Sequence, residues 1–128
     1  MTVGVLVADD QAPFRRAARA VIRATAGFEL VGEATSGEEA VALCGALRPE
    51  LVLMDILMAG MGGIEATRVI SIAHPAVVTI LLSTYRREDL PAAAHSCGAA
   101  GYLHKSDFGA GALARALDGR PQASRAAR

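Results

Sequence analysis

The fold is decided by the stretch Leu51-Val52-Leu53-Met54-Asp55, which leads through a short link into Gly60-Met61-Gly62-Gly63. A short apolar run that ends in a carboxylate is typical of a buried strand with a functional side chain at its end. The glycines favour a tight turn, and apolar residues at helical spacing follow as far as Pro75. A strand, a turn and a helix in this order predict one unit of a parallel α/β sheet.

The same unit recurs before and after this stretch. Apolar runs predict four further strands, over residues 3–8, 30–34, 77–82 and 99–103. Apolar residues at helical spacing follow each run, and the pair Ser36 and Glu39 predicts a capping box at the start of the second helix. Five strand–helix units therefore fit the chain.

The helix expected after the fourth strand is the weakest of the set. We expect it to begin near Asp89, because Pro91 suits a first helical turn, and to end at Gly98. Its inward face would consist of Leu90, Cys97 and two alanines. Small side chains bury little apolar surface, so we expect this helix to be held weakly.

Length and composition predict a single globular domain. The chain has 128 residues, is 52% hydrophobic and carries a formal net charge of +0, which argues against disorder and against nucleic acid as a main partner. We place the domain at residues 1–118. The last ten residues carry three arginines and no acid, and we expect 119–128 to be a flexible basic tail or the start of an interdomain linker. No membrane span or leader peptide is predicted, so we expect a cytoplasmic protein.

Polar side chains follow four of the five predicted strands. They are Asp9 and Asp10 after the first strand, Asp55 after the third, Ser83 and Thr84 after the fourth, and Lys105, the one lysine of the chain, after the fifth. The carboxyl ends of parallel strands meet at one edge of the sheet, where ligands bind in open α/β folds. We therefore expect these side chains to share one cleft, with the second strand at the edge of the sheet.

The chemistry of this set points to phosphate. Three carboxylates in one cleft repel each other unless a cation neutralises them, and oxygen ligands without His or Cys select Mg²⁺ or Mn²⁺. A lysine, a neighbouring hydroxyl and the N–H groups of a glycine-rich turn suit a phosphoryl group. Asp55 is the candidate nucleophile because it stands alone at the centre of the sheet, whereas Asp9 and Asp10 are paired and better placed to hold metal.

Together these motifs resemble the receiver domain of two-component response regulators. The residues that carry the resemblance are Asp9-Asp10, Asp55-Ile56-Leu57-Met58, Gly60-Met61-Gly62-Gly63-Ile64-Glu65-Ala66, Ser83 and Gly98-Ala99-Ala100-Gly101-Tyr102-Leu103-His104-Lys105. They span roughly residues 3–118 and look most like receivers of regulators with a C-terminal helix-turn-helix DNA-binding domain. The resemblance implies a flavodoxin-like (βα)5 doubly wound sandwich, with a five-stranded parallel sheet of order 2-1-3-4-5. The chain is then either a stand-alone receiver or the first domain of a longer regulator whose DNA-binding domain is missing.

The resemblance also implies roles for individual residues. Asp55 would be the phospho-acceptor, with Asp10, Asp55 and the carbonyl of Leu57 on Mg²⁺ and Asp9 acting through water. Lys105 would bind the phosphate, and Ser83 would be the switch hydroxyl. Tyr102 would be the switch aromatic, with a fixed strand tyrosine as the alternative. His104 lies beside Lys105, but we expect a strand neighbour to point the other way and to have no catalytic role.

Three positions depart from the family pattern. Ala59 stands where proline is usual and Gly62 where an acid is frequent, so we expect a looser loop. Ser106 follows Lys105 where many members have proline, and a cis bond there would cost roughly 3 kcal/mol. No chemical group is lost, so we expect phosphorylation to survive. Leu57 cannot orient an attacking water, which suggests slow self-dephosphorylation.

The sequence therefore predicts a signalling module, not an enzyme with a separate substrate. Its phosphoryl donor would be a sensor histidine kinase or a phosphotransfer protein, and the family also implies a homodimer through the helix near Asp89, the fifth strand and the last helix. One alternative is a receiver-like interaction domain that acts without phosphate. A phosphatase with an aspartate nucleophile is weaker, because Leu57 stands where such enzymes have a second aspartate. Flavodoxin-like cofactor binding is weaker still, because acids occupy the loop that would cradle a phosphate.

Overall fold

The computed structural model describes residues 2–117. The predicted tail at 119–128 lies outside these residues, as does Asp118 at the predicted domain boundary. Within the described part of the chain, no helix has both the length and the apolar character needed to cross a membrane.

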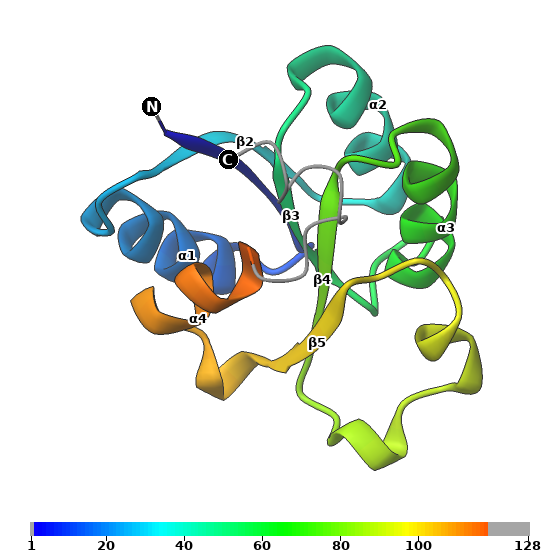
Figure 1. The fold of residues 1–128 in the computed structure, drawn as a ribbon. Helices are drawn as coiled ribbons and strands as arrows, with labels where there is room; N and C mark the ends of the chain where they lie inside the picture. Colours follow the sequence, from blue (N-terminus) through cyan, green and yellow to red (C-terminus); the bar gives the residue numbers. More distant parts are fainter. Residues whose placement is uncertain (1, 118–128) are drawn as a thin grey trace.

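Five strands and four α-helices make up the domain in alternating order, apart from the connection between the last two strands (Figure 1). In chain order they are β1 (Val3–Ala8), α1 (Ala12–Ala24), β2 (Phe28–Ala34), α2 (Gly37–Leu47), β3 (Leu51–Asp55), α3 (Gly63–Ala73), β4 (Val78–Ser83), β5 (Gly101–His104) and α4 (Ala110–Ala116). All five predicted strands are present, with ends that differ from the predicted ones by at most two residues.

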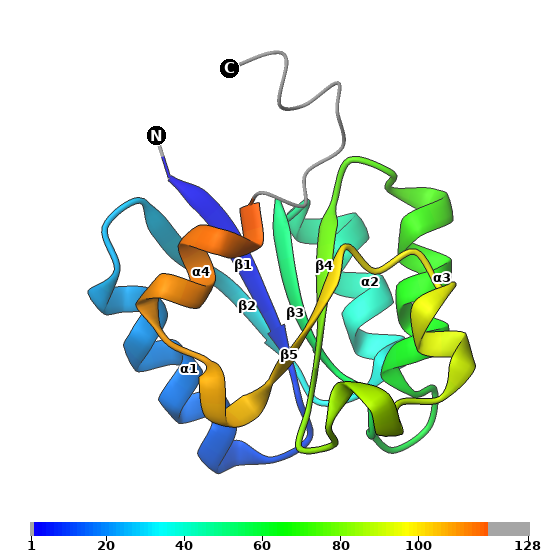
Figure 2. The same ribbon diagram turned by 60° about the horizontal axis from the view of Figure 1, so that its bottom comes forward.

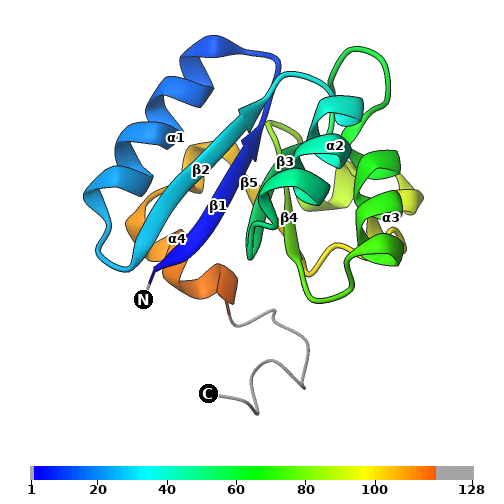
Figure 3. The same cartoon turned by 90° about the horizontal axis from the view of Figure 1, so that it is seen from above.

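The strands form one parallel sheet of order β2-β1-β3-β4-β5, which confirms the predicted topology and the edge position of β2. Helices α1 and α4 cover one face, and α2 and α3 cover the other (Figures 2 and 3). Successive strand side chains point to opposite faces, so β1 sends Val5 and Val7 into one core and Leu6 and Ala8 into the other. Because β1, β3 and β4 are covered on both faces, their residues are apolar apart from Thr79 of β4 and the polar side chains at the carboxyl ends of β3 and β4.

The start of α2 is set by its cap. The hydroxyl of Ser36 accepts a hydrogen bond from the N–H of Glu39 at 3.1 Å, as predicted. The Glu39 carboxylate returns to the N–H of Thr35, one residue before the one that the capping box requires. At the other end, Arg48 takes a left-handed conformation with φ of 49° and the helix stops before Pro49. The cap therefore fixes where α2 meets the end of β2.

The prediction of an α-helix that begins near Asp89 is wrong. In place of an α-helix, the described chain has two short 3-10 turns between β4 and β5, at Arg87–Asp89 and Ala92–His95. The chain is extended at both Leu90, with ψ of 146°, and Pro91, with ψ of 149°, so no helix runs through this point. For Leu90 the cause is the proline that follows, which drives the preceding residue out of the helical region. The small inward side chains, of which Ala94 and Cys97 are buried, do not compensate for the break. The domain is therefore a (βα)5 arrangement with one α-helix missing, and the predicted dimer face lacks that helix.

Candidate functional site

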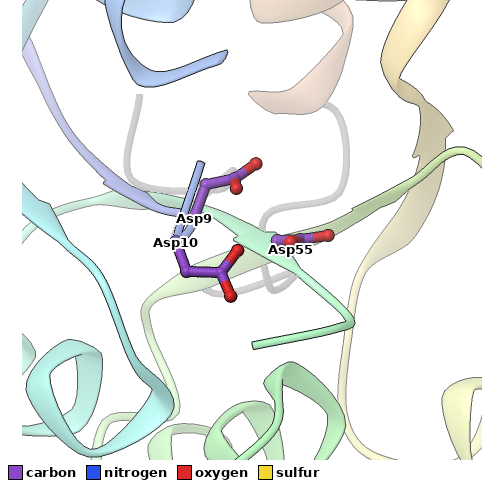
Figure 4. Close-up of side chains that lie close together, drawn as sticks. All are labelled: Asp9, Asp10 and Asp55. Carbon is purple, nitrogen blue, oxygen red and sulfur yellow. The ribbon is translucent and has the colours of Figure 1, made fainter. Parts of the chain in front are cut away.

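The strand register brings the three predicted carboxylates together. Ala8 of β1 pairs with Met54 of β3, so the next residues along, Asp9 and Asp55, lie side by side at the carboxyl edge of the sheet. Oxygen atoms of Asp9, Asp10 and Asp55 lie within 4.8 Å of one another, and Figure 4 shows the three side chains in one group. The prediction that these three acids lie together is confirmed.

Asp9 is the most enclosed of the three, with no exposed surface. Its Oδ1 accepts a hydrogen bond of 2.8 Å from the N–H of Gln11. Its Oδ2 lies 2.6 Å from Nζ of Lys105, an ion-pair distance, but makes no hydrogen bond of acceptable angle with any described residue. This buried oxygen thus has the lysine charge beside it, and its carboxylate chemistry also suits a metal ion or a metal-bound water.

Asp10 and Leu57 complete the predicted metal-binding set. The Asp10 side chain is exposed at the rim of the group, where a hydrated cation has access. The backbone N–H of Leu57 donates to the Asp55 carboxylate, while its side chain is 58% exposed and offers no polar atom. The set is all oxygen, which fits Mg²⁺ or Mn²⁺, and the ligand role of the Leu57 carbonyl stays a prediction.

Asp55 has a raised pKa of about 6. Burial is the main cause, followed by repulsion from Asp9, and Asp10 adds a smaller repulsion. Lys105, with Nζ 3.5 Å from Oδ1 of Asp55, lowers the pKa, and so does the N–H of Leu57. The acids therefore outweigh the lysine, which is the charge imbalance that a divalent cation would correct.

Lys105 reaches this group from the carboxyl end of β5, the edge strand opposite β2. Ser83 of β4 pairs with His104 of β5, so Lys105 lies one residue beyond the ladder, in a 3-10 turn at Lys105–Asp107. Its ammonium group stands 4.8 Å from the ring centroid of Phe14 on α1, within the range of a cation–π contact. No described peptide bond is cis, so the Lys105–Ser106 bond is trans.

The predicted switch residues lie next to each other. Ser83 is buried at the end of β4, whereas Thr84 lies beyond the strand and is exposed. The Ser83 hydroxyl accepts a hydrogen bond of 3.0 Å from the N–H of Tyr85. Tyr102 is half-buried, and its hydroxyl donates to the carbonyl of Tyr85 and lies 3.3 Å from that of Ser83. The phenol ring is therefore anchored on the loop that follows Ser83.

The glycine-rich turn after Asp55 is tied to α2. The N–H of Met61 donates to Glu38 at 2.9 Å, and the carbonyl of Met61 accepts from the N–H of Gly37 at 3.0 Å. Gly60 has φ of 70°, a conformation that glycine adopts without strain. The two contacts of Met61 therefore fix the turn to the first turn of α2.

Two residues at this site were not predicted from the sequence. Phe14 of α1 is not among the predicted site residues, although its ring faces the Lys105 ammonium group. His104 is expected only to lack a catalytic role, and its contacts with Thr84 and Ser106 are not among the predictions. A hydrogen-bond acceptor two residues before Ser106 is a local signal for a side-chain-capped turn, but the contact to Thr84 depends on strand pairing.

The arrangement has the parts needed to bind and accept a phosphoryl group. Asp55 offers a carboxylate, Lys105 a fixed positive charge, and Ser83 a hydroxyl on the next strand. The acidic group of Asp9, Asp10 and Asp55 lies beside them. A carboxylate beside a fixed cation and a hydroxyl can accept a phosphoryl group by in-line transfer.

Comparison with known proteins agrees with this geometry. The family model of the response regulator receiver domain matches residues 5–118. The response regulator UvrY of Escherichia coli O6:H1 is 42% identical over 103 residues, which are 80% of this chain and 47% of that protein. The response regulator GacA of Pseudomonas viridiflava is 37% identical over the same share of this chain and 48% of its own. The chain thus spans about half the length of these curated relatives.

Solved structures give the same result for the fold. The receiver domain of the response regulator NarL from Mycobacterium tuberculosis superposes with a TM-score of 0.84 at 28% identity, and the match covers 93% of this chain and 98% of that one. A LuxR-family response regulator from Aurantimonas sp. SI85-9A1 has a TM-score of 0.81 at 30% identity, covering 92% of this chain and 84% of that one.

Proposed function

The chain belongs to the response regulator receiver family, and on that premise we propose that it accepts a phosphoryl group on Asp55 in a Mg²⁺-dependent reaction and changes conformation in response. The observation that carries the proposal is the meeting of Asp55 with two further carboxylates and Lys105 at one edge of the sheet.

In the proposed reaction an ionised oxygen of Asp55 attacks phosphorus and forms an acyl phosphate. The bond between phosphorus and the donor atom breaks, and the donor leaves with that electron pair. Lys105 and the Ser83 hydroxyl are placed to hold phosphoryl oxygens, since both stand at the carboxyl edge next to Asp55. Mg²⁺ or Mn²⁺, when held by Asp9, Asp10, Asp55 and the Leu57 carbonyl, would neutralise the charge that otherwise repels the phosphoryl group.

The proposed change of shape uses Ser83 and Tyr102. A Ser83 hydroxyl that turns toward a phosphoryl group gives up its contact with the N–H of Tyr85. Tyr102 is bound to the carbonyl of Tyr85, so movement of that loop reaches β5. A phosphoryl group that contacts one arrangement of the loop better than the other shifts the population toward it.

The donor we infer is a sensor histidine kinase or a phosphotransfer protein, and the output is control of a partner or of transcription. A cytoplasmic location belongs to the same proposal. In this reading the protein is a signalling domain that catalyses only its own phosphorylation and dephosphorylation. With the helix between β4 and β5 absent from the described residues, β5 and α4 are the elements left to form the predicted homodimer face.

The test is intact mass after incubation with Mg²⁺ and acetyl phosphate or phosphoramidate. We expect one added phosphoryl group that hydroxylamine removes, and no addition to Asp55→Asn. Asp89→Asn is the matched control, because Asp89 is an exposed aspartate in a 3-10 turn away from the acidic group. Folded protein that gains no phosphate from either donor would support the alternative, a receiver-like interaction domain that acts without phosphorylation.

A further inference from the structure

His104 ends β5 and makes polar contacts through both ring nitrogens. Its Nε2 lies 2.9 Å from the carbonyl oxygen of Thr84, in the loop after β4. Its Nδ1 lies 3.1 Å from the N–H of Ser106 and 2.8 Å from the Ser106 hydroxyl. The ring is half-buried at this place, so these contacts compete only partly with water.

The partners fix the roles of the two nitrogens. A carbonyl oxygen can only accept, so Nε2 must carry a proton and donate to Thr84. A backbone N–H can only donate, so Nδ1 must accept from Ser106. The ring therefore serves as the neutral Nε2-protonated tautomer, in which Nε2 donates to Thr84 and Nδ1 accepts from Ser106.

The two contacts reach the two loops that carry the phosphate-binding groups. Thr84 directly follows Ser83, and Ser106 directly follows Lys105. The contact to Ser106 also caps the turn at Lys105–Asp107, since the His104 side chain accepts the hydrogen bond at its start. The His104 ring thus links the residue that follows Ser83 to the residue that follows Lys105.

We propose that His104 is a positioning residue, which sets the spacing between Ser83 and Lys105 around a phosphoryl group on Asp55. The inference rests on the proposed function, because it concerns the same site. It assigns His104 no contact with phosphate, and it predicts that the acids which hold the cation do not depend on it, since neither of its partners is one of them.

Two substitutions separate the two contacts. His104→Asn places an oxygen where Nδ1 stands and keeps the bond from the Ser106 N–H, but it is too short to reach Thr84. His104→Gln places an amide N–H near the position of Nε2 and keeps the bond to Thr84, but it removes the acceptor for Ser106. His104→Ala removes both bonds. His95→Ala is the control, because His95 is an exposed histidine on the turn Ala92–His95.

The measurement is the affinity of each variant, made over residues 1–128, for beryllofluoride, a stable phosphoryl mimic, at saturating Mg²⁺, together with its affinity for Mg²⁺ alone. We expect His104→Asn and His104→Gln each to weaken beryllofluoride binding roughly fivefold, the usual worth of one hydrogen bond, and His104→Ala to weaken it more. Mg²⁺ affinity should stay at the wild-type value in all variants. In a Ser83→Ala background His104→Asn should add nothing, whereas His104→Gln should still weaken binding.

The inference is overturned if wild type binds the mimic and all three His104 variants bind it equally well. A fall of Mg²⁺ affinity in step with the mimic also overturns it, because that result shows a general structural role. A wild-type protein that binds Mg²⁺ but no mimic instead removes the proposed function, and the inference with it.

Discussion

Nζ of Lys105 lies 2.6 Å from Oδ2 of Asp9, nearer than to Asp55, from which it is 3.5 Å away. Asp9 has no exposed surface, so this lysine is the charge that makes a buried carboxylate tolerable when no metal is bound. The same lysine is the group that we infer binds the phosphoryl oxygens. The ammonium group of Lys105 cannot pair fully with Asp9 and bind a phosphoryl oxygen at the same time. A cation bound to the acids would neutralise Asp9 and leave the lysine available for the phosphoryl group.

Replacing this lysine should therefore cost stability in a way that depends on metal. We expect Lys105→Met to lose about 3–5 kcal/mol of unfolding free energy in EDTA, because Asp9 is left buried without its lysine partner. Saturating Mg²⁺ should recover most of that loss. Urea unfolding under both conditions measures it, with Arg68→Met as the control, since the ion pair of Arg68 with Glu65 is exposed and worth under about 1 kcal/mol. An equal loss with and without Mg²⁺ would contradict this explanation.

The raised pKa of Asp55 predicts a second effect on stability. Its pKa is about 6 in the folded protein against an ordinary value of 3.8. Between pH 4 and pH 6 the folded state binds more protons than the unfolded state, so stability falls as pH rises through this window. Above pH 6 the full penalty is present, about 3 kcal/mol at most from the size of the shift.

Asp55→Asn should remove this penalty. We expect the variant to unfold at higher urea concentration than wild type at pH 7 in EDTA, and the difference to disappear below about pH 4, where both states of wild type are protonated. A wild type that is the more stable protein at pH 7, or a difference that does not change with pH, would show that the carboxylate is not destabilised.

The exposed side chain of Leu57 predicts a slow loss of phosphate. It stands two residues after the acceptor and has no polar atom with which to orient water. Leu57→Asn adds an amide at an exposed position, so the fold should be unaffected and the decay of labelled phosphoprotein should be faster, by roughly tenfold if orientation of the water contributes about 1.4 kcal/mol. Leu47→Asn, at an exposed leucine on α2, is the control. Decay that is no faster in Leu57→Asn than in wild type would count against the hypothesis.

Gly63 is required where the turn after Asp55 enters α3. A methyl group at Gly63 would stand 1.9 Å from the carbonyl oxygen of Asp55, which is backbone and cannot move aside easily. We expect Gly63→Ala to cost about 3 kcal/mol and to weaken phosphorylation by displacing Asp55. Gly45→Ala in α2 meets open space and should instead gain about 0.5–1 kcal/mol. Equal stabilities of the two variants in urea would refute the assignment of this close contact.

The connection between β4 and β5 should open more readily than the sheet. Arg87–Asp89 contains no buried residue, and in Ala92–His95 only Ala94 is buried. Backbone amides there are held by few tertiary contacts, so hydrogen exchange at residues 86–96 should be faster than in β4 by orders of magnitude. Protection of this segment equal to that of β4 would mean that a stable helix forms there after all.

Several features of the site could be read from the sequence because they depend on strand periodicity. Asp9, Asp55, Ser83 and Lys105 each follow an apolar run, and parallel strands bring such positions to one edge whatever the details of packing. The burial of Ser83 and the exposure of Thr84 instead reflect the end of β4 between them. The missed helix shows the limit, since Pro91 supports a helix that begins at its own position but forbids one that includes Leu90.

By itself, then, the sequence determined the sheet, its edge of polar groups and the resemblance that names the family, because these follow from the order of apolar runs and the residues at their ends. Only the tertiary structure decided which group each side chain touches. The ring of Phe14 under Lys105, the bond of His104 to Thr84 and the bond of Met61 to Glu38 join residues far apart in the chain. Such contacts depend on the strand register and on how closely helices and strands pack together. A local pattern of residues does not determine either quantity.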